Sequence, residues 1–252
     1  MSRAKGQDLA PACRALLDSG QAATATLAEC LAVDFAALLR AAVPEAGEAA
    51  AQALDAAAAQ GITRRMALAA ALLLRQPGPQ GLPGWANHPS DTVRGWACFV
   101  AGAQPGLALH ERLATLQPLA DDAHFGVREW AWLAVRPHIA GDLDTAIGLL
   151  AQWARHPSER VRRFASEALR PRGVWCTHLG PLKQTPQRAL PVLEPLRADP
   201  SAYVQDSVGN WLNDAAKDQP GWVRALCADW LAASPTSATR RICTRAQRSI
   251  SP

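Results

Sequence analysis

Three carboxylates, on three successive segments of a repeating pattern, are the side chains best suited to chemistry. They are Glu129, Glu167 and Asp214. On a helical wheel with about 100 degrees per residue, all three fall within one sector of about 80 degrees. The positions equivalent to Glu167 in earlier repeats are Phe99 and Leu133, so a carboxylate replaces an apolar residue. Such acids usually only solubilise an outer face, but acids in a basic, phosphate-facing groove would repel phosphate and so need another reason to be there.

The surroundings of these acids are rich in arginine. The chain has 23 arginines and three lysines, and residues 153–172 contain six arginines against two carboxylates. Guanidinium groups suit bidentate contacts with phosphate. A genome rich in G and C would also favour arginine codons, so composition alone leaves a phosphate-binding role open.

A repeat of about 34 residues must position these groups. The pattern Val-Arg-x-aromatic-Ala starts at Val93, Val127 and Val161, and a weaker copy starts at Val204. This period is typical of stacked helical hairpins, which bury their apolar faces against one another. Alanine and leucine dominate, and no alternating strand pattern is evident, so we predict an all-α fold, a curved α-solenoid of hairpin repeats.

The repeats suggest three regions along the chain. We expect an N-terminal helical bundle over residues 1–80, continuous with repeats over 81–233, and a basic, disordered tail over 234–252. In the bundle, we predict helices over residues 8–18, 27–43, 48–60 and 62–76, followed by a loop over 77–84. In the repeats, the first helices are expected over 107–120, 143–155, 187–198 and 221–232. The second helices are expected to start near Ser90, His124, Ser158 and Ser201, where serine suits an N-cap.

Three of the second helices carry an arginine directly after their repeat valine. On the wheel, Arg94, Arg128 and Arg162 share one angle beside the core face. They would form either a positive stripe that follows a phosphate backbone or a solvated flank. Trp132 and Trp175 are expected to be exposed aromatic side chains able to stack on a base or a sugar.

Other functional classes find little support in the sequence. The six cysteines form no CxxC pair and have no histidine at zinc-ligand spacing, so we predict no metal and no cofactor. The longest apolar run, residues 66–74, is too short to cross a bilayer, and the first residues do not form a signal peptide. We therefore expect a cytoplasmic bacterial protein, monomeric and without an obligate protein partner.

Two segments resemble a known family. Residues 165–175, Ala-Ser-Glu-Ala-Leu-Arg-Pro-Arg-Gly-Val-Trp, are similar to one signature of the AlkC-type DNA alkylation repair proteins, HEAT-like-repeat glycosylases related to the AlkD type. Residues 203–218, Tyr-Val-Gln-Asp-Ser-Val-Gly-Asn-Trp-Leu-Asn-Asp-Ala-Ala-Lys-Asp, are similar to a second signature. The resemblance extends over residues 85–232. Ala168 and Gln205 depart from the signatures, which have glycine and arginine there, and the second change removes an expected phosphate contact.

The resemblance implies a function and roles for individual residues. It implies base excision repair of double-stranded DNA, in which the N-glycosidic bond of cationic bases such as 3-methyladenine or 3-methylcytosine is hydrolysed by a monofunctional, metal-independent glycosylase. Glu167 and Asp214 would be catalytic acids, with Glu129 in support. The expected DNA-binding residues are Arg94, Arg128, Arg162, Arg163, Arg170, Arg172, Lys217, Trp132 and Trp175. The alternative is a non-catalytic helical-repeat module that binds DNA or protein.

Overall fold

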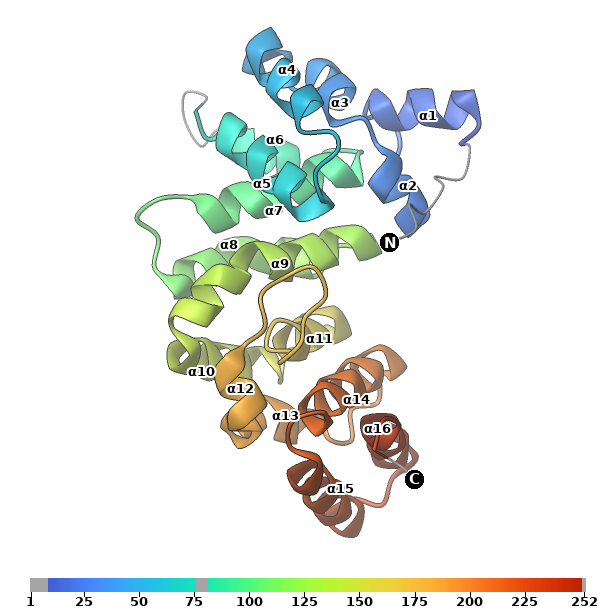
Figure 1. The fold of residues 1–252 in the computed structure, drawn as a ribbon, viewed down its shortest axis with the longest axis vertical. Coiled ribbons are helices and arrows are strands. Elements are labelled where there is room, and N and C mark those ends of the chain that lie inside the picture. The colour runs from blue at the N-terminus through green and yellow to red at the C-terminus, as the bar shows by residue number, and fades with distance from the viewer. Residues whose placement is uncertain (1–8, 76–80, 251–252) are drawn as a thin grey trace. The chain divides into compact units, whose positions relative to one another are not determined.

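The computed structural model describes residues 9–75 and 81–250. Every regular element in this part of the chain is helical, and it contains no β-strand, so the predicted all-α class is confirmed (Figure 1). The chain forms two compact units. The first comprises residues 1–107 and 122–134, and the second comprises residues 108–121 and 135–252.

The first unit is built from short helices whose apolar faces meet around large aromatic side chains. Phe35 and Trp96 pack edge to face with ring centroids 5.5 Å apart, and both are fully buried. The expected helix over 27–43 is interrupted, because Asp34 caps a new helix by accepting hydrogen bonds from the amides of Ala36 and Ala37. The elements are α1 (Pro11–Asp18), α2 (Leu27–Ala32), α3 (Phe35–Ala42), the 3-10 helix η1 (Pro44–Ala46), α4 (Glu48–Ala56), α5 (Ile62–Leu73), α6 (Gly81–Ala86), α7 (Asp91–Ala103) and the first part of α9 (Phe125–Gly141).

The second unit contains the helices that carry the two C-terminal acids. Its core includes Phe164 and Trp211, and the indole of Trp211 donates a hydrogen bond to the carbonyl of Leu169. The expected helix over 187–198 is broken into three short pieces because Pro186, Pro191 and Pro195 each start a new turn. The elements are α8 (Leu109–Ala120), the rest of α9, α10 (Leu143–Trp153), α11 (Glu159–Glu167), α12 (Gly180–Gln184), η2 (Pro186–Ala189), α13 (Leu190–Leu193), η3 (Glu194–Leu196), α14 (Ala202–Ala216), α15 (Pro220–Ala233) and α16 (Ser237–Gln247).

Serine caps start three of the repeat helices, as the sequence predicts. The hydroxyls of Ser90, Ser158 and Ser201 accept hydrogen bonds from amides in the first turns of α7, α11 and α14. Each cap satisfies an amide that has no partner within its own helix. The register of the second helices therefore follows directly from the sequence.

The prediction that the C-terminal tail is disordered is wrong. Residues 237–247 form α16, which packs against α14 and buries Ile242, Cys243 and Ala246. The side-chain amide of Asn213 on α14 donates to the carbonyl of Ala246. The apolar positions of α16 recur at helical spacing, and burying them outweighs the basic, polar character of the segment.

The expected boundary at residue 80 also differs from the observed division, because both compact units contain residues from the predicted repeats. Residues 76–80 lie outside the described part of the chain, and α6 begins at Gly81 within the expected loop. Among the described residues, no helix has the length and apolar character that a transmembrane span requires.

Candidate active site

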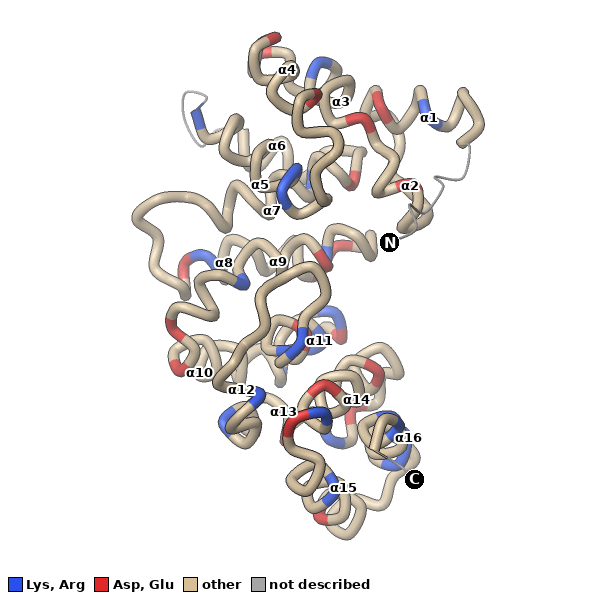
Figure 2. The backbone as a smooth tube through the Cα atoms, viewed as in Figure 1, with Lys and Arg blue, Asp and Glu red and all other residues tan. Residues whose placement is uncertain are grey.

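Glu167 and Asp214 are brought together by Arg170. Glu167 is the last residue of α11 and Asp214 lies near the end of α14, and these two helices pack against each other. The Nη1 of Arg170 lies 2.8 Å from Oε1 of Glu167, and its Nε and Nη2 lie 2.9 and 2.8 Å from Oδ2 of Asp214. Only 4% of Glu167 and 5% of Asp214 is exposed. Figure 2 shows acidic and basic residues on α11 and acidic residues on α14.

All four oxygens of the two carboxylates have a partner. Oε2 of Glu167 accepts a hydrogen bond of 2.6 Å from the hydroxyl of Ser207 and lies 3.6 Å from the guanidinium of Arg163. Oδ1 of Asp214 lies 3.7 Å from the ammonium of Lys217, a long contact to a side chain that is 46% exposed. Glu167 is thus held tightly on both oxygens, whereas Asp214 has one loosely held oxygen.

The charges around Glu167 keep its carboxyl group ionised. Burial alone would raise the pKa of Glu167, but Arg163, Arg170 and the Ser207 hydroxyl outweigh burial and lower it. Burial opposes the charge of Arg170 as well, yet Glu167 and Asp214 raise the pKa of its guanidinium. Three cations, Arg163, Arg170 and Lys217, face two anions, so the cluster has a net charge of +1 (3 − 2).

A buried arginine fixes the backbone that carries Arg170. Arg136 is 2% exposed, and its Nη1 and Nη2 donate to the carbonyls of Ala168 and Arg170 at 2.6 and 2.5 Å. These bonds satisfy carbonyls at the C-terminal end of α11, which lack partners within the helix. The loop that follows presents Trp175, which is 47% exposed and has a positive φ of 61°. Its predicted exposure is confirmed.

The first unit holds Trp132 and Glu129. Trp132 was expected on the surface, but it is 3% exposed, so that prediction is wrong. Its indole nitrogen donates a hydrogen bond of 2.7 Å to Oε2 of Glu129. The three-residue spacing places these side chains on adjacent turns of α9, where the indole packs into the core while its nitrogen reaches the acid. The grouping of Glu129 with Glu167 and Asp214 stays a prediction.

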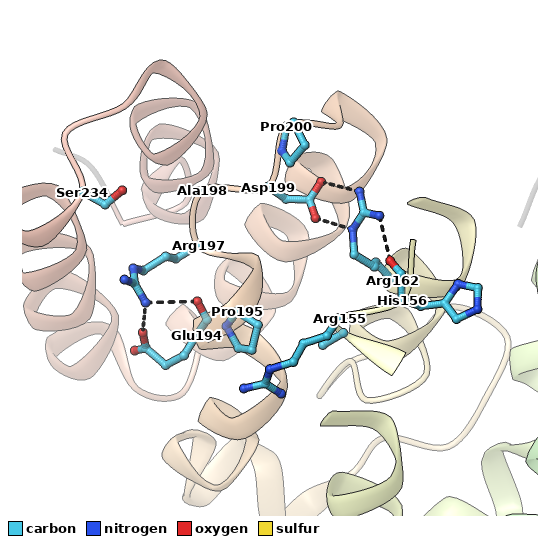
Figure 3. A pocket seen from close by; sticks show the side chains of 11 residues that line it. Arg155, His156, Arg162, Glu194, Pro195, Arg197, Ala198, Asp199, Pro200 and Ser234 are labelled. Atoms are coloured by element: carbon cyan, nitrogen blue, oxygen red, sulfur yellow. Dashed lines mark hydrogen bonds and ion pairs between the residues drawn. The ribbon is translucent and has the colours of Figure 1, made fainter. Parts of the chain in front are cut away.

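The repeated arginines stabilise the turns before their helices, and the phosphate-binding stripe stays a prediction. The Nη1 of Arg94, of Arg128 and of Arg162 each donates to the carbonyls five and six residues earlier. Arg94 also pairs with Asp122, and Arg162 pairs with Asp199 (Figure 3). We call this arrangement the turn clamp.

Gln205 occupies the same position in the next repeat. It is 7% exposed, and its side-chain amide donates to the carbonyl of Asp199, six residues earlier. Gln205 therefore keeps part of the turn clamp. The loss of a phosphate contact at this position stays a prediction.

The other expected phosphate-binding residues lie around the acid pair. The guanidinium of Arg163 lies over the ring of Tyr203, 4.6 Å from its centroid, and also faces Glu167. Arg172 pairs with Asp218 through two nitrogens, at 2.9 to 3.2 Å. Both arginines are partly buried, so their intramolecular contacts are part of the site's architecture.

Four residues of the site were not identified from the sequence. Arg136, Lys183, Ser207 and Asp218 each contact a charged or polar group of the site. Ser207 and Asp218 lie inside the second signature, next to residues that were identified. Nothing in the local sequence distinguishes Arg136 or Lys183 from the other basic residues, because their roles depend on which segments pack together.

Comparisons with known proteins find relatives of this chain. Residues 126–246 match the model of a family described as DNA alkylation repair enzyme. The uncharacterized protein YhaZ of Bacillus subtilis is 38% identical over 132 residues, which cover 52% of this chain and 36% of YhaZ. This chain thus spans about a third of that relative's length.

Solved structures share the fold. The Pseudomonas fluorescens alkylpurine DNA glycosylase AlkC, bound to DNA containing an abasic site analog, superposes with a TM-score of 0.64 and 25% identity, over 85% of this chain and 60% of that one. AlkD2 of Streptococcus mutans superposes with a TM-score of 0.62 and 20% identity, over 81% of this chain and 100% of that one. The second likeness concerns the fold alone.

Proposed function

Because residues 126–246 of the chain match the model of the DNA alkylation repair enzyme family, we propose that this protein is a DNA glycosylase of that family. It hydrolyses the N-glycosidic bond of cationic alkylated bases, of the 3-methyladenine and 3-methylcytosine class, in double-stranded DNA. The observation that carries the proposal is the buried pair of Glu167 and Asp214 bridged by Arg170. Burying two carboxylates is costly, and a helical scaffold of this kind does not need them for its core.

The proposed reaction uses the positive charge of the damaged base. When the bond between C1′ and the base nitrogen breaks, its electron pair moves onto the base, which leaves as a neutral molecule. The sugar acquires oxocarbenium character, which a nearby carboxylate stabilises electrostatically. Water then attacks C1′ and loses a proton, and Asp214 is the acid with an oxygen available to accept it.

The two acids have different roles in this mechanism. Glu167 keeps Arg170 in place, since its oxygens are held by Arg170, Ser207 and Arg163. Asp214 uses Oδ1, whose only described partner is the exposed Lys217 at 3.7 Å. Trp175 supplies an aromatic surface beside the lesion, and no metal is required by this scheme.

A non-catalytic DNA-binding module is the second candidate. It is favoured by the complete pairing of the four carboxylate oxygens, which would suit a purely structural role. The two candidates differ in one experiment. Purified protein is incubated with duplex DNA treated with a methylating agent, and released bases are separated chromatographically. The glycosylase releases alkylated bases faster than the spontaneous rate, whereas the module binds the DNA and leaves the rate unchanged.

A further inference from the structure

A polar cavity lies beside the acid pair. Its volume is about 520 Å³, and all its lining residues belong to the second unit. They come from α12 and from the turn between α14 and α15, and comprise Gly180, Lys183, Gln184, Lys217, Asp218 and Gln219. Two of the three lysines of the chain therefore line one cavity.

The ammonium groups in this cavity have distant partners. Nζ of Lys183 lies 3.9 Å from Asp218, and Nζ of Lys217 lies 3.7 Å from Asp214. Charge-assisted hydrogen bonds between such groups are about 2.7–2.9 Å long, so both contacts are ion pairs without a hydrogen bond. Each carboxylate meanwhile has a closer arginine partner, Arg172 for Asp218 and Arg170 for Asp214.

The balance of charge favours an anion. Arg172, Lys183 and Lys217 contribute three positive charges, and Asp218 contributes one negative charge, which leaves +2 (3 − 1) when Asp214 is counted with Arg170. The side-chain amides of Gln184 and Gln219 on the lining are further hydrogen-bond donors. A phosphate group carries the negative charge and the acceptor oxygens that these donors require.

We propose that this cavity binds a phosphate group of the DNA backbone next to the damaged nucleotide. This inference rests on the proposed function for the source of the phosphate. Binding draws Lys217 from Asp214 onto the phosphate, because a hydrogen-bonded contact replaces a contact of 3.7 Å. Oδ1 of Asp214 then faces the sugar, so that gripping the backbone prepares the acid for the reaction.

The small number of lysines gives a direct test. Lys5, Lys183 and Lys217 are modified with a brief pulse of an amine-selective acetylating reagent, and each is quantified by mass spectrometry, with Lys5 as the internal reference. Three parallel reactions contain, respectively, a duplex with an abasic-site analogue, inorganic phosphate, and chloride, all at matched ionic strength. The duplex is expected to slow acetylation of Lys183 and Lys217 several-fold relative to Lys5.

The arms separate the possible outcomes. Equal acetylation with and without duplex overturns the proposal, and protection by inorganic phosphate without protection by duplex overturns the assignment to the DNA backbone. The proposed glycosylase activity is tested separately, by base release. Protection of the lysines without base release would support the phosphate subsite and contradict the glycosylase activity.

A variant pair provides a second measurement. Lys183→Met is expected to lower the slope of log Kd against log salt for the duplex by about 1, as for the loss of one phosphate contact. Arg188→Gln is the control, because Arg188 is in the same unit, outside the cavity, and pairs with the exposed Asp144. Slopes that fall equally in both variants, or in neither, contradict the subsite.

Discussion

Arg170 reaches Asp214 through two nitrogens that converge on a single oxygen. Its Nε and Nη2 lie 2.9 and 2.8 Å from Oδ2, and the other oxygen, Oδ1, faces only Lys217 among the described residues. The same guanidinium holds Glu167 through Nη1. One arginine thus bridges two buried acids on α11 and α14, and leaves one oxygen of Asp214 facing only the distant Lys217 among the described residues.

Removing Arg170 should destabilise the protein. Arg170→Met leaves two buried carboxylates without their common partner, which should cost about 3–5 kcal/mol in the free energy of unfolding. Arg172→Met is the control, because the pair with Asp218 is more exposed and should cost less than about 1 kcal/mol. Urea denaturation measures both. Equal losses in the two variants would show that the bridge contributes no more than a surface ion pair.

The stability should depend on pH through Glu167. Its pKa is lower in the folded protein than the usual value of 4.5, because the neighbouring arginines and Ser207 outweigh burial. The ionised acid therefore stabilises the fold above about pH 4.5, and this contribution is lost as the pH falls through the folded pKa. We expect Glu167→Gln to flatten the decline in unfolding free energy between about pH 6 and pH 3. A decline in this variant as steep as in the wild type would show that Glu167 does not cause the pH dependence.

The turn clamp should matter for folding and not for DNA affinity. Arg162→Met removes two carbonyl contacts and the pair with Asp199, at a cost of about 2–4 kcal/mol. Arg162→Gln should cost less, because Gln205 makes one such contact in the neighbouring repeat. The salt dependence of DNA binding should stay unchanged in the glutamine variant. A slope lower by about 1 would instead mean that Arg162 binds phosphate.

Trp175 should contact the DNA. It is 47% exposed on the loop that follows Arg170, and stacking of an aromatic side chain on a base contributes about 1–3 kcal/mol. Trp175→Ala should therefore raise the Kd for duplex with an abasic-site analogue by about 5- to 100-fold, measured by fluorescence anisotropy. Arg188→Gln serves as the surface control. An unchanged Kd would show that Trp175 does not contact the DNA.

The sequence predicts much of this fold because its repeats follow local rules. The 34-residue period and the Pro-Ser turns locate the starts of α7, α11 and α14, where serine caps form. The missed helix α16 shows the limit of local rules. Its arginines suggest a solvated tail, and the helix is stable because it buries Ile242 and Ala246 and packs against α14 and α15, which lie earlier in the chain.

The candidate site was predicted in part, for a similar reason. Helical angles and signatures both select Glu167 and Asp214, but a helical wheel reports direction and not burial. It could not show that Trp132 is buried, or that Arg94 and Arg162 turn back onto their own carbonyls. Arg136 and Lys183 act through segments more than 30 residues away, so their roles emerge only from the packed structure.

Base release by Asp214→Asn tests the central claim most directly. The wild type, Asp214→Asn and Glu167→Gln are incubated with methylated duplex, and binding to the same duplex is measured in parallel. The rate of base release by Asp214→Asn should be lower than that of the wild type by on the order of 100-fold or more, while its Kd for the duplex stays close to the wild-type value. Release at the wild-type rate by Asp214→Asn, with binding intact, would contradict the assignment of Asp214 as the acid that acts on the sugar.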